Sequence, residues 1–213
     1  MAWLNLNIKL GDLARIRPGL PFRSRIESHA EGDIAVIQAR DLGDDGNVSV
    51  EGAARVRFLP ASPKDGFLKA HDVLLQPRGT RFPVAIFEQA EFSAVAAAPI
   101  YTLRADASRI LPEFLAAVLM SPATQAVLRQ SAVGTYVPQV PRQAVENLQI
   151  ELPDLPSQMK LADLARLERR EREMMDRLRD ARARVFDLAV REVVKKARKR
   201  ANASGPEPVP PVR

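Results

Sequence analysis

The chain has 213 residues, of which 46 % are hydrophobic, enough for one well-buried domain and an additional segment. It contains no cysteine and only two histidines, so disulfides, cysteine nucleophiles, thiolate metal sites and histidine-rich metal sites are excluded. No apolar run approaches the roughly 18 residues of a membrane span, and none near the start suits a signal peptide, so a cytoplasmic protein is expected.

The formal net charge of +6 is unevenly distributed along the chain. Residues 1–156 carry 16 basic and 17 acidic side chains, whereas residues 157–200 carry 15 basic and 8 acidic ones. The positive excess is therefore a property of the second segment. Basic side chains in the first part have to be judged by position instead.

Short apolar runs separated by Gly, Pro and Asp occupy the chain up to Pro156, a pattern typical of strands and turns. Two helices interrupt them. Pro112 suits a first helical position and precedes apolar residues at helical spacing, and a second helix follows Ser121–Pro122 to about Ser131. This mixture predicts an α+β domain with a largely antiparallel sheet. The expected strands are Asp33–Gln38, Arg55–Leu59, Asp72–Gln76, Pro83–Glu88, Ile100–Arg104 and Leu148–Leu152.

The stretch Asp41–Asn47, DLGDDGN, is expected to form a turn, because Asp, Asn and Gly tolerate left-handed backbone. Its carboxylates at Asp41, Asp44 and Asp45 either bind a divalent cation or face solvent. The loop matches no Ca²⁺ ligand pattern, which favours the solvated turn.

Two arginines flank a glycine and a threonine in the connection PRGTR, between two expected strands. Arginine forks pair with guanine, glutamine pairs with adenine, and threonine contacts phosphate or a thymine methyl group. A glycine lets the backbone approach a ligand closely. A second basic group, Arg15, Arg17, Arg23 and Arg25, surrounds the turn-like stretch RPGLPFRSR, and a third candidate is the loop GTYVPQ.

Each group taken alone also fits a solvated loop, but their joint presence on connections of a compact domain favours binding. The predicted DNA-binding residues are Gln76, Arg78, Gly79, Thr80, Arg81, Arg23, Arg25, Arg40, Thr135, Tyr136 and Gln139.

No Gly or Pro occurs from Ser157 to Arg200, which predicts one helix of about 66 Å with Ser157 as its N-cap. Its apolar stripe either packs along the side of the same domain or pairs with another helix. A helix this long would extend past a domain of about 155 residues, which favours pairing with another helix. A glutamate in the stripe either sets the register or is a defect. The heptad positions, the seam, are Leu164, Leu167, Glu171, Met174, Leu178, Ala181, Val185 and Leu188.

The run KKARKR near the end of this helix either contacts phosphates or is a solvated helix end. Residues 201–213 are rich in proline and are expected to be disordered. The sequence thus predicts a DNA-recognition domain over 1–156, a spacer helix over 157–200 and a tail over 201–213.

Catalytic motifs are missing from the sequence: GxSxG, GxxxxGK[ST], GxGxxG and HExxH do not occur. The dipeptide Pro153–Asp154 has no acidic-x-Lys at a suitable distance, so a metal-dependent nuclease core is not supported. We expect a protein without its own catalytic activity, cofactor or metal.

Five passages, in order, make the chain resemble one half of a type I restriction–modification specificity (S) subunit, with one target recognition domain and one spacer helix. Three residues depart from the family pattern: His71, where a glycine is usual, Asp154, where a proline is common, and Ser157, where a glutamate is usual. The passages are KLGDLARIRPG, GDIAVIQARDL, LKAHDVLLQPRGT, ILPEFLAAVLMSP and VGTYVPQVPRQAVENLQIELPDLPSQMKLADL.

The resemblance implies a non-catalytic subunit that reads one half-site of double-stranded DNA. Partner modification methyltransferase subunits would hold S-adenosylmethionine, and a restriction subunit, if present, would drive cleavage. Because most members carry two domains and two helices, two copies of this chain would form a homodimer through their helices. Three alternatives stay open: an independent DNA-binding module or defence accessory, a truncated subunit that pairs with another specificity subunit, and a nuclease with an unrecognised site.

Overall fold

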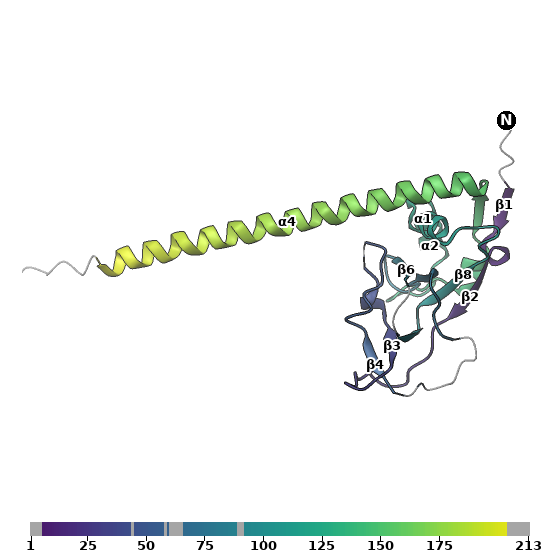
Figure 1. Ribbon diagram of the computed structural model, residues 1–213, viewed down its shortest axis with the longest axis horizontal. Helices are drawn as coiled ribbons and strands as arrows, with labels where there is room; N and C mark the ends of the chain where they lie inside the picture. The colour runs from purple at the N-terminus through teal and green to yellow at the C-terminus, as the bar shows by residue number, and fades with distance from the viewer. Residues whose placement is uncertain (1–5, 44, 58, 60–65, 89–91, 204–213) are drawn as a thin grey trace, which may run out of the picture. The chain divides into compact units, whose positions relative to one another are not determined.

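A computed structural model describes residues 6–43, 45–57, 59, 66–88 and 92–203 of the chain (Figure 1). The chain divides into two compact units, Met1–Arg169 and Arg170–Arg213. The first contains every strand and the first four turns of the long helix. None of the described helices has the length and apolar character needed to cross a membrane.

A four-stranded antiparallel sheet lies at the centre of the first unit. Its strand order is β2 (Ala14–Pro18), β8 (Tyr101–Ala105), β5 (Asp72–Leu75) and β6 (Val84–Phe87). Every residue of β5 and β6 is buried, which explains why all of them except Asp72 are apolar. The sheet is therefore covered on both faces at these strands.

A second sheet contains β4 (Ala54–Val56), β3 (Ile34–Ile37) and β7 (Ser93–Ala96), in that order. β3 pairs with β4 antiparallel and with β7 parallel. Two further strands, β1 (Leu6–Lys9) and β9 (Gln149–Leu152), form a separate antiparallel pair.

Three short helices follow β8, namely α1 (Pro112–Met120), α2 (Pro122–Ser131) and α3 (Arg142–Glu146). The Ser121 hydroxyl accepts a hydrogen bond from the Thr124 backbone N–H at 3.3 Å and so caps the start of α2. Two single 3-10 turns, Leu10–Asp12 and Ala39–Asp41, follow β1 and β3.

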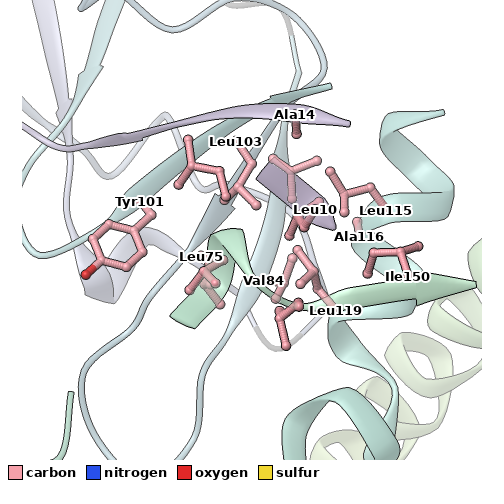
Figure 2. Close-up of a cluster of buried hydrophobic side chains, with 14 of the residues drawn as sticks. Leu10, Ala14, Leu75, Val84, Tyr101, Leu103, Leu115, Ala116, Leu119 and Ile150 are labelled. Carbon is pink, nitrogen blue, oxygen red and sulfur yellow. The ribbon is translucent and has the colours of Figure 1, made fainter. Parts of the chain in front are cut away.

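The main core lies between the helices and one face of the four-stranded sheet (Figure 2). The opposite face of that sheet packs its own apolar residues against the second sheet. The unit is thus built as helices, sheet and sheet, in that order. Labelled core residues in Figure 2 are Leu10, Ala14, Leu75, Val84, Tyr101, Leu103, Leu115, Ala116, Leu119 and Ile150.

The long helix α4 runs from Leu155 to Ala203 and begins two residues before the predicted start. The Asp154 carboxylate accepts a hydrogen bond from the Ser157 backbone N–H at 2.9 Å, which makes Asp154 rather than Ser157 the N-cap. Pro156 is tolerated because the first turn of a helix has no internal partner for its N–H groups. The aspartate at this departure from the family pattern therefore has a structural use.

Gln158 fixes the start of α4 to the domain and is only 1 % exposed. Its Oε1 accepts from the Leu111 N–H at 2.9 Å, and its Nε2 donates to the carbonyls of Arg109 and Pro153 at 3.0 and 2.9 Å. One side chain thus joins the first turn of α4 to the segment before α1 and to the end of β9.

Side chains at all the seam positions of α4 are exposed in the single chain. Ion pairs three or four residues apart support the helix along its polar surface, among them Arg179–Asp176 at 2.9 Å and Arg191–Asp187 at 2.8 Å. The first compact unit continues to Arg169, thirteen residues past the boundary expected at 156.

The predicted fold class is confirmed, and each of the six expected strands corresponds to an observed one. Three strands and one helix were missed: β1, β2, β7 and α3. Of the expected turn at Asp41–Asn47, Asp44 lies outside the described residues, but Gly46 adopts a left-handed φ of 80°, as the turn prediction requires. The expected tail lies mostly outside the described residues, and α4 continues to Ala203.

His71 has a left-handed φ of 67°, at the position where the resembling family usually has glycine. Glycine adopts this conformation without steric cost, which is a physical reason for the family pattern. The His71 Nδ1 lies 3.2 Å from the Glu113 carboxylate.

We expect Gln158→Ala to lower the free energy of unfolding by about 2–3 kcal/mol, because one buried N–H and two carbonyls lose their partner. Urea unfolding followed by circular dichroism measures the change. The matched control is Gln130→Ala at an exposed position of α2, which should stay within about 0.5 kcal/mol. Equal effects of the two substitutions would contradict the clamping role.

Hydrogen bonds from the Ser157 hydroxyl and backbone N–H lower the pKa of Asp154 below its ordinary value of 3.8. A carboxyl group whose pKa is lower in the folded state than in the unfolded state stabilises the folded protein at pH values above its unfolded-state pKa. This stabilisation is lost as the pH falls through its folded-state pKa. Asp154→Ala should therefore destabilise the protein at pH 7 and destabilise it progressively less as the pH falls below 3.8. Asp154→Asn keeps an acceptor for the cap, so its effect should depend much less on pH in the same unfolding series.

Candidate nucleic-acid interface

The connection between β5 and β6 is held at both of its ends. The Gln76 N–H donates to the Pro83 carbonyl at 2.9 Å, which extends the hairpin by one pair beyond Leu75 and Val84. Phe82 is buried in the main core, and its carbonyl accepts from the Gln125 Nε2 at 3.0 Å. Between these anchors, the side chains of Arg78, Thr80 and Arg81 are exposed.

Gly79 stands at the bend of this connection with a φ of 116°, a conformation that favours glycine. Its N–H donates to the Pro138 carbonyl at 2.9 Å. The glycine is thus used for a backbone contact with a second loop, 59 residues later in the sequence.

The second loop lies between α2 and α3 and closes on itself. Val133 and Gln139 exchange two backbone hydrogen bonds, of 2.9 and 2.8 Å. Gly134 has a φ of 110°, which allows the tight turn. At the tip of this loop, the aromatic side chain of Tyr136 is 99 % exposed to solvent.

The two loops pair with each other, and we refer to residues 76–81 and 133–139 as the paired loops. Besides the Gly79 contact, the Val140 N–H donates to the Pro77 carbonyl at 2.9 Å, and Arg78 lies opposite Gln139 in an antiparallel bridge. The buried Tyr101 hydroxyl donates to the Val140 carbonyl at 3.0 Å and ties the arrangement to the sheet. Two of the candidate groups found in the sequence are therefore one surface.

Within the paired loops, Gln76 differs from its neighbours. Its Nε2 donates to the Arg78 carbonyl at 3.3 Å, and its Oε1 is buried without a hydrogen-bond partner among the described atoms. This side chain braces the loop from inside. The side chains of Arg78, Thr80 and Arg81 are exposed, as are those of Thr135 and Tyr136.

The chemistry of the paired loops suits a polyanion. They carry two guanidinium groups, one phenol, two threonine hydroxyls and no acidic residue. Arginine and threonine contact phosphates and base edges, and an exposed tyrosine offers both a hydrogen-bond donor and a ring for stacking.

The other predicted DNA-binding residues lie on different parts of the first unit. Arg23 and Arg25 are exposed on the segment after β2, whose Leu20, Phe22 and Ile26 pack against the second sheet. Arg40 is exposed in the 3-10 turn Ala39–Asp41. The structure does not join these three arginines to the paired loops by any of the contacts described above, and their role in binding stays a prediction.

Arg15 and Arg17, from the same sequence group, are separated from Arg23 and Arg25 by the fold. Both lie on β2, where they are paired in register with Arg104 and Thr102 of β8. With Gly19 and other residues they line an open cavity of about 250 Å³. The sequence group is therefore two structural groups.

Sequence analysis missed the ion pair between Arg104 and Asp72, which connects β8 to β5. The guanidinium donates twice to the carboxylate, at 2.7 and 2.6 Å, and the carboxylate also accepts from the Lys69 N–H at 2.8 Å. Asp72 is 1 % exposed, so the pair is a structural element. The only signal for it was the aspartate of the LKAHDVLLQPRGT motif.

In the expected acidic turn, the two carboxylates that the structure describes accept hydrogen bonds from neighbouring residues of the same loop. Asp41 accepts from the Gln38 N–H at 2.8 Å, and Asp45 accepts from the Asn47 N–H and side chain, both at 3.0 Å. Asp44 lies outside the described residues. Across the described ranges, no group of three or more His, Cys, Asp or Glu side chains could hold a metal ion.

No family model and no curated protein matches the sequence. Solved structures do match. The HsdS subunit from Thermoanaerobacter tengcongensis has a TM-score of 0.55 at 16 % identity, over 80 % of this chain and 38 % of the subunit. A chain from a study of assembly and conformational transition of the type I R-M system has a TM-score of 0.59 at 16 % identity. The match covers 80 % of this chain and 40 % of the other. The type I S subunit from M. genitalium has a TM-score of 0.51 at 15 % identity, over 77 % of this chain and 38 % of that subunit.

The chain has the fold of a type I specificity subunit. It spans about two fifths of the length of the solved chains that it matches. The fold expected from the five sequence motifs is thereby confirmed.

We expect Gly79→Ala to lower the free energy of unfolding by about 1–3 kcal/mol, because a side chain strains the backbone at a φ of 116°. Gly52→Ala is the matched control, since its backbone lies outside the left-handed region and a Cβ there would meet only the Ser49 Oγ at 3.6 Å. Thermal and urea unfolding measure both. A Gly79 variant as stable as the Gly52 variant would contradict the role of this bend.

Proposed function

We propose that this chain is a half-length specificity subunit of a type I restriction–modification system, which binds double-stranded DNA and directs partner subunits to it. The observation that carries the proposal is the pairing of two polar, acid-free loops into one exposed surface. The domain that carries this surface has the fold of type I specificity subunits. Loops held by a rigid scaffold are where recognition residues are commonly found.

In this proposal the chain itself is non-catalytic and acts in the cytoplasm. Modification methyltransferase subunits hold S-adenosylmethionine and carry out the reaction. Where the system cleaves DNA, a restriction subunit joins them. The M. genitalium neighbour is named as the S subunit of a type I restriction–modification system, and the T. tengcongensis neighbour as an HsdS subunit, which supports the assignment of partners.

The paired loops read one half-site. Arg78 and Arg81 bind base edges or phosphates, with Thr80, Thr135, Tyr136 and Gln139 around them. An arginine held against guanine contributes about 1–3 kcal/mol of discrimination between bases. An arginine on a phosphate contributes affinity for every sequence and increases the salt dependence.

Two copies of the chain restore the two-domain layout of the family. The exposed seam of α4 supports this, because a self-complementary surface closes with two copies related by a two-fold axis. Each copy then presents its paired loops to one half of a split, inverted-repeat site.

The test is charge reversal at Arg78 and Arg81, singly and together, in the chain co-expressed with its methyltransferase. Methylated positions are mapped by sequencing, and affinity for duplex DNA is measured against salt. We expect the double variant to lose sequence-specific methylation. A single variant at a phosphate contact should lower the salt slope by about one, whereas one at a base contact should relax the preference at one position.

Arg57→Glu is the control, because Arg57 is also an exposed arginine but lies after β4 and pairs with Glu31. It should leave methylation unchanged. Specific methylation that persists in a folded double variant would show that the paired loops are not the reader. Specific DNA binding without any associated methyltransferase would favour an independent DNA-binding module.

A further inference from the structure

The loop between α2 and α3 has an apolar tip. Three of its large hydrophobic side chains are exposed, those of Val133, Tyr136 and Val137. Among the described residues before α4, the other exposed side chains of this kind are those of Phe67 and Val127. Most of the exposed apolar groups of the domain therefore gather on one of the paired loops. Such a gathering marks a contact site more often than scattered exposed residues do.

The two tyrosines of the chain have opposite environments. Tyr101 is 6 % exposed, and its hydroxyl donates to the Val140 carbonyl at 3.0 Å. Tyr136 is 99 % exposed, so almost the whole of its ring and its hydroxyl face solvent. A tyrosine removes about 150–250 Å² from water when it is buried. Tyr136 keeps this surface for a ligand.

The backbone that carries Tyr136 is fixed on both sides of it. A Cβ added at Gly134 would lie 3.3 Å from the Val137 carbonyl oxygen, which shows how tightly the loop turns. Pro138 has a restricted φ, and its carbonyl accepts from the Gly79 N–H at 2.9 Å. A ring on a braced loop is preorganised, because little backbone entropy is lost when it enters a ligand.

We propose that Tyr136 is a wedge whose ring enters the base stack of the bound duplex at one step of the half-site. This inference rests on the proposed function and specifies how the paired loops read DNA. Aromatic side chains stack on bases of any sequence, because every base has a π-face. Apolar side chains that enter a duplex partly unstack one base step and kink the helix. Val133 and Val137 cover the opened step beside the ring.

Charge around the tip favours DNA over a protein partner. Arg78 is exposed and lies opposite Gln139, directly beside the tip, and the paired loops contain no acidic residue. A ring that enters a duplex has phosphates on either side of it, which suit a basic and acid-free surround. An apolar contact with a protein has no such requirement.

A wedge distinguishes sequences without a hydrogen bond to a base edge. Opening a step costs least at the flexible pyrimidine–purine steps TA and CA/TG. We therefore expect Tyr136 to favour one of these steps at a fixed position of the half-site. An opened step also suits a partner that modifies a base, because such enzymes act on a base that has left the stack.

The experiment uses the full chain with its co-purified methyltransferase and a duplex that this natural complex selects from random sequence. A series of duplexes then carries a single mismatch at each successive position. A mismatched pair costs less to unstack, so binding should tighten where the ring enters and nowhere else. Tyr136→Ala should remove this tightening. It should also weaken binding of the matched duplex by about 5- to 150-fold, the loss of one base stack.

Two further variants make the result specific. Tyr136→Phe keeps the ring and removes the hydroxyl, so it should bind every duplex of the series as the natural chain does. Val127→Ala is the matched control, because it also removes an exposed apolar side chain but lies on α2, outside the paired loops. It should leave the mismatch series unchanged. Thermal unfolding checks that each variant is folded.

A folded Tyr136→Ala complex with the natural affinity and mismatch series would overturn the wedge. A Tyr136→Phe complex that behaves like Tyr136→Ala would also overturn it, in favour of a hydrogen bond from the hydroxyl. Loss of the methyltransferase from Tyr136→Ala, with affinity for the duplex intact, would overturn it in favour of a protein contact. A selected duplex with no tightening at any position overturns the wedge alone, whereas a natural complex that selects no sequence contradicts the proposed function itself.

Discussion

The exposed apolar seam of α4 is the feature on which the proposed pairing of two copies depends. Six of its eight positions are Leu, Met or Val. Burying such side chains between two copies contributes on the order of 10 kcal/mol in total. That is similar to the cost of bringing two proteins together. The proposed pairing of two copies therefore depends on how well the facing side chains of the seam fit one another.

The paired loops are held together by backbone hydrogen bonds between two segments that lie far apart in the sequence. Pro77, Gly79, Pro138 and Val140 hold them together through their main chains, so the exposed side chains of Arg78, Thr135 and Tyr136 are not needed to join the loops. Glycines at Gly79 and Gly134 make the bends possible. Such a surface can change its side chains without losing its framework, a property that suits the proposed reading of DNA sequences.

Much of this fold could be predicted because its strongest signals are local. The buried strands β5 and β6 are apolar except for Asp72, α1 and α2 each begin with proline, and α4 has no Gly or Pro over its predicted span. The missed strand β2, ARIRP, carries two arginines and a proline, and β7 is short and rich in alanine. The pairing of the two loops could not be foreseen, because it joins residues about 60 positions apart through backbone groups that carry no sequence signal. The N-cap was misplaced by the choice of Ser157 over Asp154, two residue types that both suit the position.

In the proposed dimer the length of α4 sets the distance between the two sets of paired loops, so the spacing of bound half-sites tests the proposed pairing most directly. Purified complexes of the natural chain, and of a variant lacking the heptad Leu178–Arg184, would each select binding sites from random duplex DNA. Paired copies predict two inverted half-sites at a fixed gap, shortened in the variant by about 10 Å of helix, or roughly three base pairs. Selection of a single half-site, or of the same gap by both proteins, would contradict it.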